Sequence, residues 1–288
     1  MKKILVTGAS GFVGNYVVSE LLKNNYQVIA SASSEKNIKS KEWFSRVQFV
    51  PFNFKDFVQE ENYFHFFNEP DLLIHLAWEG LPNYKSLFHF EENLPGHYAF
   101  LKNLITHGLS DITVTGTCLE YGLKEGKLSE DMVTNPSNSY AIAKDTLRKF
   151  LEQLQSVQPF HLKWIRLFYM YGAGQNPNAI FSQLEKAIAN NEEVFNMSKG
   201  EQERDYLSIG KVASYIKSIA TQNKITGIIN CCSGKPVKLK DLVREFLEEK
   251  KSTISLNPGY YPYPDYEPMS FWGDDTRLKT ILANNGSN

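Results

Sequence analysis

The chain has 288 residues, of which 42% are hydrophobic and 22% charged, and its formal net charge is −1. This composition is typical of a soluble globular protein, and the balanced charge disfavours a surface that binds nucleic acid or a membrane. No run of 18 apolar residues occurs, and the apolar run near the N-terminus is too short for a signal peptide, so we expect a cytoplasmic protein.

Short apolar runs alternate with helical patterns through the first two thirds of the chain. The expected strands are Ile4–Thr7, Val28–Ser31, Val47–Phe52, Leu72–Leu76, Ile112–Thr115 and Lys163–Phe168. The helical patterns between them include Phe12–Asn24, Asn93–His107 and Ser139–Gln155. Several of the strand runs are apolar without alternation, as in strands that are buried on both faces. This βα order predicts an α/β fold with a Rossmann-type, doubly wound parallel sheet.

A glycine-rich turn joins the first expected strand to the first helix, with glycines spaced as GxxGxxG. In this context glycine permits a tight turn, close approach of a diphosphate and close packing of the helix on the strand. Free N–H groups at the helix N-terminus would bind the phosphates. The residues expected to contact a dinucleotide here are Gly8, Ser10, Gly11, Phe12, Val13 and Gly14. The alternative is an ordinary βα turn that requires glycine.

The end of the second expected strand bears on the choice of dinucleotide. Ala32 occupies the position where an acidic residue would bind the adenosine ribose. Ser33, Ser34 and Lys36 could instead hold a 2′-phosphate, which favours NADP(H). Glu35 argues mildly for NAD(H), which stays possible.

Tyr140 and Lys144 lie one helical turn apart and share a helix face. An ammonium near a phenol would lower the pKa of the tyrosine, which could then exchange a proton with a substrate oxygen near neutral pH. Thr117, at a strand end, could donate a hydrogen bond to the same oxygen. The Tyr–Lys spacing alone is also found on solvated helix faces.

After residue 172 the βα rhythm loosens. Helices are expected at Ala179–Asn190, Val212–Gln222 and Leu239–Lys250, and a strand at Ile228–Cys231. The segment Pro258–Asp275 is rich in proline, tyrosine and glycine, which predicts an irregular loop.

Taken in order, these motifs resemble the extended short-chain dehydrogenase/reductases, which include nucleotide-sugar epimerases, dehydratases and reductases. The resemblance runs from residue 1 to about residue 280 and includes an Asn-x-x-Gly helix start at Asn93 and Gly96. Arg166 with Tyr171-Gly172, and the segment Arg204-Asp205-Tyr206, match further motifs. The resemblance implies an NAD(P)-binding Rossmann domain over 1–172 with a returning segment near 206–232. A smaller α/β lobe, 173–205 and 233–288, would bind the nucleotide sugar.

The resemblance also implies roles for individual residues. The catalytic residues would be Thr117, Tyr140 and Lys144. Further cofactor contacts would be Asn53, Phe54, Leu76, Ala77, Trp78 and Thr115, besides Tyr140 and Lys144. Substrate contacts would be Trp78, Thr117, Cys118, Tyr169, Arg204 and Trp272, with Arg204 on the diphosphate. Relatives form homodimers through the two helices that precede and follow the catalytic threonine, so we expect a homodimer here.

Departures from the family pattern narrow the expected reaction. The carboxylates that eliminate water in the dehydratases are replaced by Cys118 and Leu119, and Glu120 would point to the opposite face. The motifs Gly116–Gly122 and Glu267–Asp274 are similar to dTDP-4-keto-6-deoxyhexose reductases. This implies a 4-ketoreductase that forms a dTDP-fucose or dTDP-6-deoxytalose type product for surface polysaccharide.

Two other functions stay open at this point. A nucleotide-sugar 4-epimerase with tightly bound NAD would use the same three catalytic residues. A non-enzymatic NAD(P)-sensing scaffold is disfavoured because those three residues are intact. The cysteines and histidines show no metal-binding spacing, so we expect no metal, and His75 is interpreted as a packed residue at a strand end.

Overall fold

The computed structural model describes residues 2–263 and 268–285. Its central sheet consists of β1 (Lys3–Thr7), β2 (Gln27–Ala32), β3 (Gln48–Pro51), β4 (Leu72–His75), β5 (Asp111–Thr117), β7 (His161–Leu167) and β12 (Gly227–Cys231). All neighbours are parallel, in the order β12-β7-β5-β4-β1-β2-β3. The order reverses beside β1, which places a crevice at the carboxyl ends of β1 and β4. The predicted fold class is therefore confirmed.

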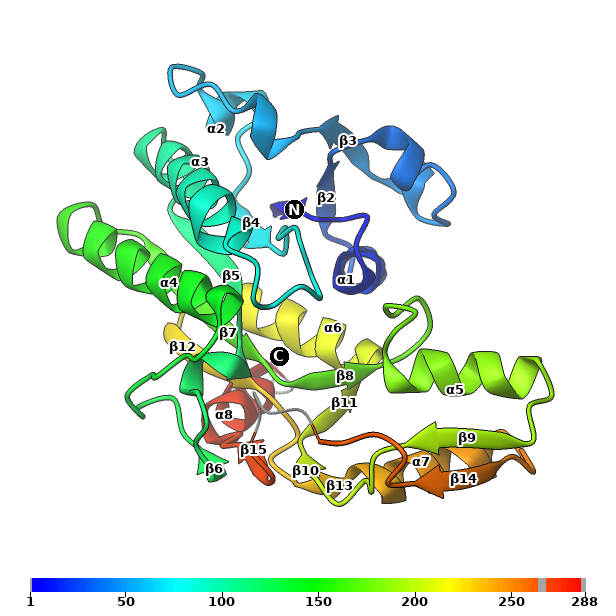
Figure 1. Ribbon diagram of the computed structural model, residues 1–288. Helices are drawn as coiled ribbons and strands as arrows, with labels where there is room; N and C mark the ends of the chain where they lie inside the picture. The colour runs from blue at the N-terminus through cyan, green and yellow to red at the C-terminus, as the bar shows by residue number, and fades with distance from the viewer. Residues whose placement is uncertain (1, 264–267, 286–288) are drawn as a thin grey trace.

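Helices cover both faces of this sheet (Figure 1). One layer contains α1 (Phe12–Lys23), α6 (Ile209–Ala220) and α8 (Thr276–Asn285), and the other contains α2 (Tyr63–Phe66), α3 (Leu94–Thr106) and α4 (Ser139–Val157). Strand β1 shows why both layers are needed. Ile4 and Val6 lie in the first apolar core, whereas Leu5 lies in the second, because successive side chains of a strand point to opposite faces.

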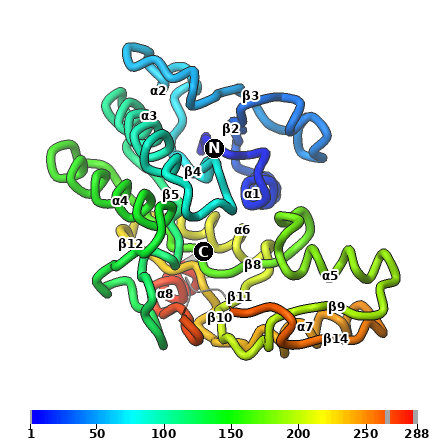
Figure 2. The backbone as a smooth tube through the Cα atoms, viewed as in Figure 1, coloured from blue at the N-terminus to red at the C-terminus, as the bar shows by residue number. Residues whose placement is uncertain are grey.

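A second group of elements lies below the sheet in the view of Figures 1 and 2. It contains α5 (Ile180–Ala189), α7 (Leu239–Glu249), β9 (Val194–Met197), β10 (Glu203–Arg204), β13 (Val237–Lys238) and β14 (Ser255–Pro258). Residues from both halves of this group share an apolar core that includes Leu184 and Val243. Two strand pairs lie beside it, β8 (Tyr169–Tyr171) with β11 (Tyr206–Ser208) and β6 (Gly126–Leu128) with β15 (Phe271–Gly273).

Five short helical segments complete the described structure. They are η1 (Glu35–Asn37), η2 (Phe44–Arg46), η3 (Phe54–Asp56), the π-helix η4 (His89–Asn93) and η5 (Cys118–Tyr121). No helix in residues 2–263 and 268–285 is both long and apolar enough to cross a membrane.

The tail differs from the prediction of an irregular loop over Pro258–Asp275. Phe271–Gly273 forms β15, and its parallel pairing with β6 is extended by hydrogen bonds from Gly126 N–H to Ser270 and from Asp274 N–H to Leu128. The pairing partner lies more than 140 residues away in the sequence, so the local composition gave no sign of it. Residues 264–267, which include Glu267 of the predicted motif, lie outside the described residues.

Candidate active site

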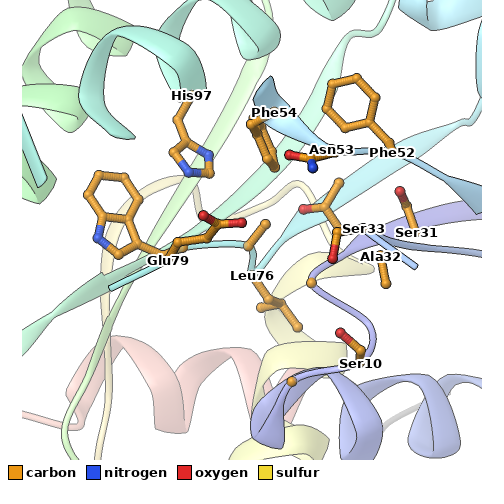
Figure 3. Close-up of a pocket in the computed structure, with 15 residues that line it drawn as sticks. Ser10, Ser31, Ala32, Ser33, Phe52, Asn53, Phe54, Leu76, Glu79 and His97 are labelled. Carbon is orange, nitrogen blue, oxygen red and sulfur yellow. The ribbon is translucent and has the colours of Figure 1, made fainter. Parts of the chain in front are cut away.

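A cavity of about 190 Å³ opens at the carboxyl ends of β1, β2 and β4. It is lined by Thr7, Gly8, Ser10, Gly11, Ser31, Ala32, Ser33, Phe52, Asn53, Phe54, Leu76, Ala77, Trp78, Glu79 and His97. Figure 3 shows β2 and the segment after β3 on one side of the cavity, with His97 and Glu79 at the other end and Ser10 below. This is the position at which doubly wound folds bind a dinucleotide.

The glycine turn has the geometry that close approach of a diphosphate requires. Gly8 has φ +71°, and a Cβ there would lie 2.7 Å from the Ala77 nitrogen. A Cβ on Gly14 would collide with the Gly8 carbonyl oxygen and lie 2.8 Å from the Ala9 Cα. Helix α1 begins after Gly11 without a side-chain cap, so its first N–H groups are available to phosphate oxygens. The turn therefore fits a dinucleotide diphosphate.

Phe12 and Val13 contribute to this turn differently from Gly8, Ser10 and Gly11. They do not line the cavity, and their side chains pack against the apolar core between the sheet and α1. Their positions in the first turn of α1 leave the backbone N–H groups as their means of contact with a phosphate.

The end of the cavity beside β2 contains only some of the residues predicted to select the dinucleotide. Ala32, Ser33 and Asn53 line it. Ser34 instead caps η1, where its hydroxyl accepts from the Lys36 N–H at 3.2 Å, and neither Ser34 nor Lys36 lines the cavity. Asn53 begins η3 and accepts from the Lys55 N–H at 3.0 Å, which orients its amide.

The fold brings Thr117 close to Tyr140 and Lys144, although Thr117 ends β5 and the other two residues lie on α4, more than 20 residues later in the sequence. The Thr117 side chain lies close enough to the Tyr140 phenol to affect its pKa, and the exposed fractions of the two residues are 7% and 8%. Lys144 donates from Nζ to the Thr115 carbonyl at 2.8 Å, and Nζ lies 4.0 Å from the centre of the Trp78 ring. The Thr115 carbonyl therefore holds Lys144 in place, and Thr115 does not line the cavity.

The electrostatics of this group differ from the expected lowering of the tyrosine pKa by Lys144. Burial raises the pKa of Tyr140 strongly, and nearby Tyr84, Glu120 and Cys118 raise it further, while the Thr117 side chain opposes the rise. Burial also lowers the pKa of Lys144 to about 7, against an opposing effect of Glu120. The expectation of a lowered tyrosine pKa was wrong for this structure, because desolvation of the buried phenol outweighs the effect that lowers its pKa.

An aromatic stack that was not recognised in the sequence holds Trp78 in place. The Trp78 ring is nearly parallel to those of His97 and His89, at centroid distances of 4.8 and 6.3 Å. Trp78 Nε1 donates to His89 Nδ1 at 3.1 Å, and His89 Nε2 faces the Asn83 carbonyl at 3.0 Å. These contacts define a neutral His89, and burial lowers its pKa.

His75 is fully buried below the stack. Its Nδ1 lies 2.8 Å from Thr7 Oγ1, and its Nε2 lies 2.9 Å from His97 Nδ1. Burial lowers the pKa of His75 to about 3, so the ring is neutral across the physiological range. The contact between His75 on β4 and His97 on α3 thus joins the sheet to α3 beside the cavity.

The residues predicted to contact the sugar nucleotide fall into two places. Cys118 and Tyr169 belong to one cluster around Phe271, and the Arg204 guanidinium lies 4.6 Å from the Phe271 ring and 5.8 Å from the Tyr169 ring. Arg204 is 2% exposed and donates to the Glu203 and Met269 carbonyls. The structure therefore brings these three predicted residues together around Phe271.

Trp272 follows Phe271 on β15 and is half-buried. It lines none of the cavities described and is not placed beside Trp78 by any contact in the described residues. The described residues also contain no cluster of three His, Cys, Asp or Glu side chains that could hold a metal ion.

Sequence reasoning missed five residues that line the cavity, namely Thr7, Ser31, Phe52, Glu79 and His97. Thr7 and Ser31 could have been inferred, because each stands at or next to the carboxyl end of a predicted strand. His97 directly follows the Asn-x-x-Gly helix start, but its direction depends on how α3 packs. Phe52 could have been inferred in the same way, because it ends the expected strand Val47–Phe52, whereas Glu79 lies in a connection whose course no local pattern predicts.

Comparisons with known proteins agree with this geometry. Residues 4–232 match the model of the NAD dependent epimerase/dehydratase family. The chain is 33% identical over 275 residues to a dTDP-6-deoxy-L-talose 4-dehydrogenase (NAD(+)) from Aggregatibacter actinomycetemcomitans, a match that covers 94% of this chain and 98% of the relative. It is 25% identical to a UDP-glucose 4-epimerase from Neisseria meningitidis, over 98% of this chain and 92% of the relative.

Solved structures show the same fold. A UDP-glucose-4-epimerase from Stenotrophomonas maltophila with bound NAD superposes with a TM-score of 0.86 at 17% identity, covering 98% of this chain and 93% of that one. A UDP-glucuronic acid 4-epimerase from Bacillus cereus, in complex with UDP-glucuronic acid and NAD, gives a TM-score of 0.80 at 23% identity and covers 98% of this chain and 93% of that one. The chain therefore belongs to the NAD dependent epimerase/dehydratase family and is an enzyme of the oxidoreductase type.

Proposed function

We propose that the protein is a nucleotide-diphosphate-sugar 4-ketoreductase that reduces C4 of a 4-keto-6-deoxyhexose. The observation that carries the proposal is the approach of Thr117 to Tyr140, with Lys144 one turn along α4, beside a cavity suited to a dinucleotide. The relative named as a dTDP-6-deoxy-L-talose 4-dehydrogenase supports a dTDP-6-deoxytalose or dTDP-fucose type product. Such sugars would serve surface polysaccharide synthesis.

The bound dinucleotide would supply the hydride. Thr117 would donate a hydrogen bond to the substrate carbonyl oxygen and so polarise it. Tyr140 would then give its proton to the oxygen at C4 as negative charge develops there. Because burial raises the pKa of Tyr140, the phenol stays protonated at neutral pH, which suits a residue that must deliver a proton to an alkoxide.

The neighbours of Thr117 support reduction over elimination. Cys118 is buried in the cluster around Phe271, and Leu119 carries no titratable group. Neither side chain can remove a proton from C5 and protonate the leaving hydroxyl, as the carboxylates of a dehydratase must. Glu120, the first acidic residue after Thr117, is fully buried and bonded to Arg166.

We propose NAD(H) as the cofactor, although the sequence favoured NADP(H). Among the described residues that line the cavity there is no lysine or arginine to hold a 2′-phosphate. The 33% identical relative is named for NAD(+), which supports the same choice. The ratio of kcat/KM for NADH and NADPH with one sugar tests this, and a ratio that favours NADPH contradicts it.

We also propose that residues 1–172 with 206–232 bind the cofactor and that 173–205 with 233–288 bind the nucleotide sugar. Arg204, packed on Phe271 and Tyr169, is the proposed anchor for the diphosphate, and Trp78, Cys118 and Trp272 are proposed to wall the sugar site.

A homodimer through α3 and α4 is proposed as well. Ile142 and Phe150, both on α4, are 42% and 43% exposed, and exposed apolar side chains on one helix are typical of a protein interface.

The deciding experiment is NADH oxidation with a panel of 4-keto-6-deoxy sugar nucleotides, followed by NMR of the product. We expect stoichiometric NADH consumption and a single configuration at C4. The 4-epimerase alternative, which the name of the Neisseria relative suggests, predicts interconversion of two nucleotide sugars without net consumption of NADH. That result would replace the reductase assignment.

A further inference from the structure

A buried carboxylate lies directly beneath the catalytic threonine and takes no part in the proposed reaction. Glu120 is fully buried, and its Oε1 accepts from the Thr117 backbone N–H at 2.9 Å and from Trp164 Nε1 at 3.0 Å. Its Oε2 accepts from Arg166 Nε at 2.7 Å. Burial raises the pKa of Glu120, but these partners in the described chain are all N–H donors, which stabilise the ionised carboxylate and oppose the rise.

Glu120 and Thr117 hold each other in a reciprocal cap around η5. While Glu120 accepts from the Thr117 N–H, Thr117 Oγ1 accepts from the Leu119 N–H at 3.3 Å. The Thr117 hydroxyl thereby accepts a hydrogen bond within the turn through one lone pair, and its hydrogen stays available to donate to a neighbouring oxygen. The direction of the catalytic hydroxyl is therefore set by the same turn that binds Glu120.

The residues around Glu120 leave space for its carboxylate. Trp164 and Arg166 are alternate residues of β7, so both side chains point to the same face. A Cβ on Gly116 would collide with Glu120 Oε1 and lie 2.6 Å from Trp164 Cε2. The Arg166 Cζ atom lies 4.3 Å from the centre of the Tyr121 ring, and this contact helps to hold the guanidinium beside Glu120.

The charge of Glu120 affects the pKa of both Tyr140 and Lys144. It raises the pKa of Tyr140 and opposes the fall in the pKa of Lys144. The other titratable groups that face Lys144 are the imidazoles of His75, His89 and His97, whose lowered pKa values make them neutral near pH 7. The Trp78 ring, 4.0 Å from Nζ, carries no net charge. Glu120 is thus the ionised carboxylate that acts on Lys144 among the described residues.

We propose that the Glu120–Arg166 pair is a positioning device of the active site, in which Glu120 fixes the Thr117 hydroxyl and supplies the negative charge beside Tyr140 and Lys144. The role in turnover rests on the proposed ketoreductase function. The electrostatic role does not, because it can be measured on the resting protein.

The test is a ¹³C NMR titration of the Lys144 side chain in protein labelled at lysine Cε, with the signal assigned through Lys144→Met. In Glu120→Gln, which keeps the acceptor for Thr117 but removes the charge, the titration midpoint should fall by about one pH unit or more. An unchanged midpoint would overturn the proposal. This readout requires neither substrate nor turnover.

The matched control is Asp111→Asn. Asp111 and Lys163 form another buried ion pair on the same two strands, at 2.5 Å, but at the opposite ends of β5 and β7. Six residues of strand, about 20 Å, separate Asp111 from Thr117. This variant should lose stability and leave the Lys144 midpoint in place. An equal shift in both variants would show a general effect of instability and would overturn the proposal.

A double variant keeps the proposal testable if Glu120→Gln does not fold. Glu120→Gln with Arg166→Met leaves no unpaired charge, and neutral replacements of buried ion pairs are often tolerated. Its midpoint should lie below that of the wild type and above that of Glu120→Gln, and a wild-type value would overturn the proposal.

Kinetic measurements separate the two proposed roles of Glu120, namely the effect of its charge and the positioning of Thr117. Under the proposed function, Glu120→Gln should shift the pH profile of kcat by about the same amount and in the same direction as the Lys144 midpoint. Glu120→Val, which also removes the acceptor for the Thr117 N–H, should lower kcat by about a further tenfold with KM little changed. An equal kcat in the two variants would exclude the positioning of Thr117. If the wild type reduces no sugar of the panel, the proposed function fails, and the NMR titration still decides the charge effect.

Discussion

At the scale of single residues, the active site is governed by burial. Tyr140 and Lys144 were recognised from their spacing, but their protonation could not be predicted from it. Each side chain is less than a tenth exposed, and desolvation is the first cause of both pKa shifts. The spacing of two residues along a helix indicates that their side chains lie close together, whereas the degree of burial decides which of the side chains is charged.

Tyr140→Phe tests the proton donor. The change removes one hydroxyl and keeps the ring in its place against Trp78. We expect kcat to fall by about 10²–10⁴-fold, because the forming alkoxide loses its general acid, while the affinity for NADH changes little. Steady-state kinetics and a fluorescence titration of NADH measure the two effects. A loss of NADH binding at an unaltered rate would contradict the assignment of Tyr140.

Lys144→Met tests the burial of the ammonium through stability. The pKa of Lys144 is about 7 in the folded protein against 10.5 ordinarily, so between these values the unfolded chain binds a proton that the folded chain does not. The free energy of unfolding of the wild type should therefore rise with pH over this range, and that of the variant should lack this contribution.

The measurement is urea unfolding without cofactor at pH 7, 8 and 9. The stability of Lys144→Met relative to the wild type should fall by about 2 kcal/mol between pH 7 and pH 9. Parallel pH dependence in the two proteins would mean that Lys144 keeps its ordinary pKa in the fold.

At the scale of elements, the sequence predicted most of what the structure contains. The six expected strands of the first two thirds coincide with β1 to β5 and β7 to within two residues at each end. These strands are buried by helices on both faces, and continuous apolar runs report that burial directly. The pair β6–β15 was missed because three-residue strands take their stability from a distant partner.

Gly14→Ala tests the closeness of α1 to the turn. The new Cβ would collide with the Gly8 carbonyl oxygen, so we expect a loss of stability of about 1–3 kcal/mol and weaker NADH binding. Gly210→Ala is the matched control, since Gly210 lies in α6 and a Cβ there would meet nothing within 4 Å.

The control should gain about 0.5–1 kcal/mol through reduced entropy of the unfolded chain. Thermal unfolding and NADH titration of both variants measure the difference. Equal behaviour of the two alanine variants would contradict the role of Gly14 in the turn.

At the scale of the whole molecule, the site depends on contacts that no local pattern contains. The Asp205 carboxylate accepts from the backbone N–H groups of Ser233, Gly234 and Gly273, which joins three segments of the chain near Arg204. Sequence reasoning found Arg204 and Asp205 as a motif but could not place them, because their partners lie 28 to 68 residues away.

Phe150→Glu tests the proposed homodimer. Phe150 is 43% exposed on α4 and contacts the Tyr98 ring of α3 at 5.3 Å, so a carboxylate there would be buried without a partner in an α3–α4 interface. We expect the variant to be monomeric by light scattering after gel filtration.

The control for this prediction is Val194→Glu. Val194 is 49% exposed on β9, away from α3 and α4, and the variant should keep the oligomeric state of the wild type. Dissociation in the control but not in Phe150→Glu would place the interface in the C-terminal part of the molecule.

The missing side chain at Gly116 has a consequence for how this protein can vary over evolution. A residue larger than glycine at 116 and a carboxylate at 120 compete for the same space beneath the threonine. Descendants that keep the acid must keep the glycine, while those that place serine or alanine at 116 must replace both the acid and Trp164, whose Nε1 would also collide with the new Cβ. The two positions should therefore change together, with Trp164 and Arg166 following, so this quartet should identify a branch of the family from sequence alone.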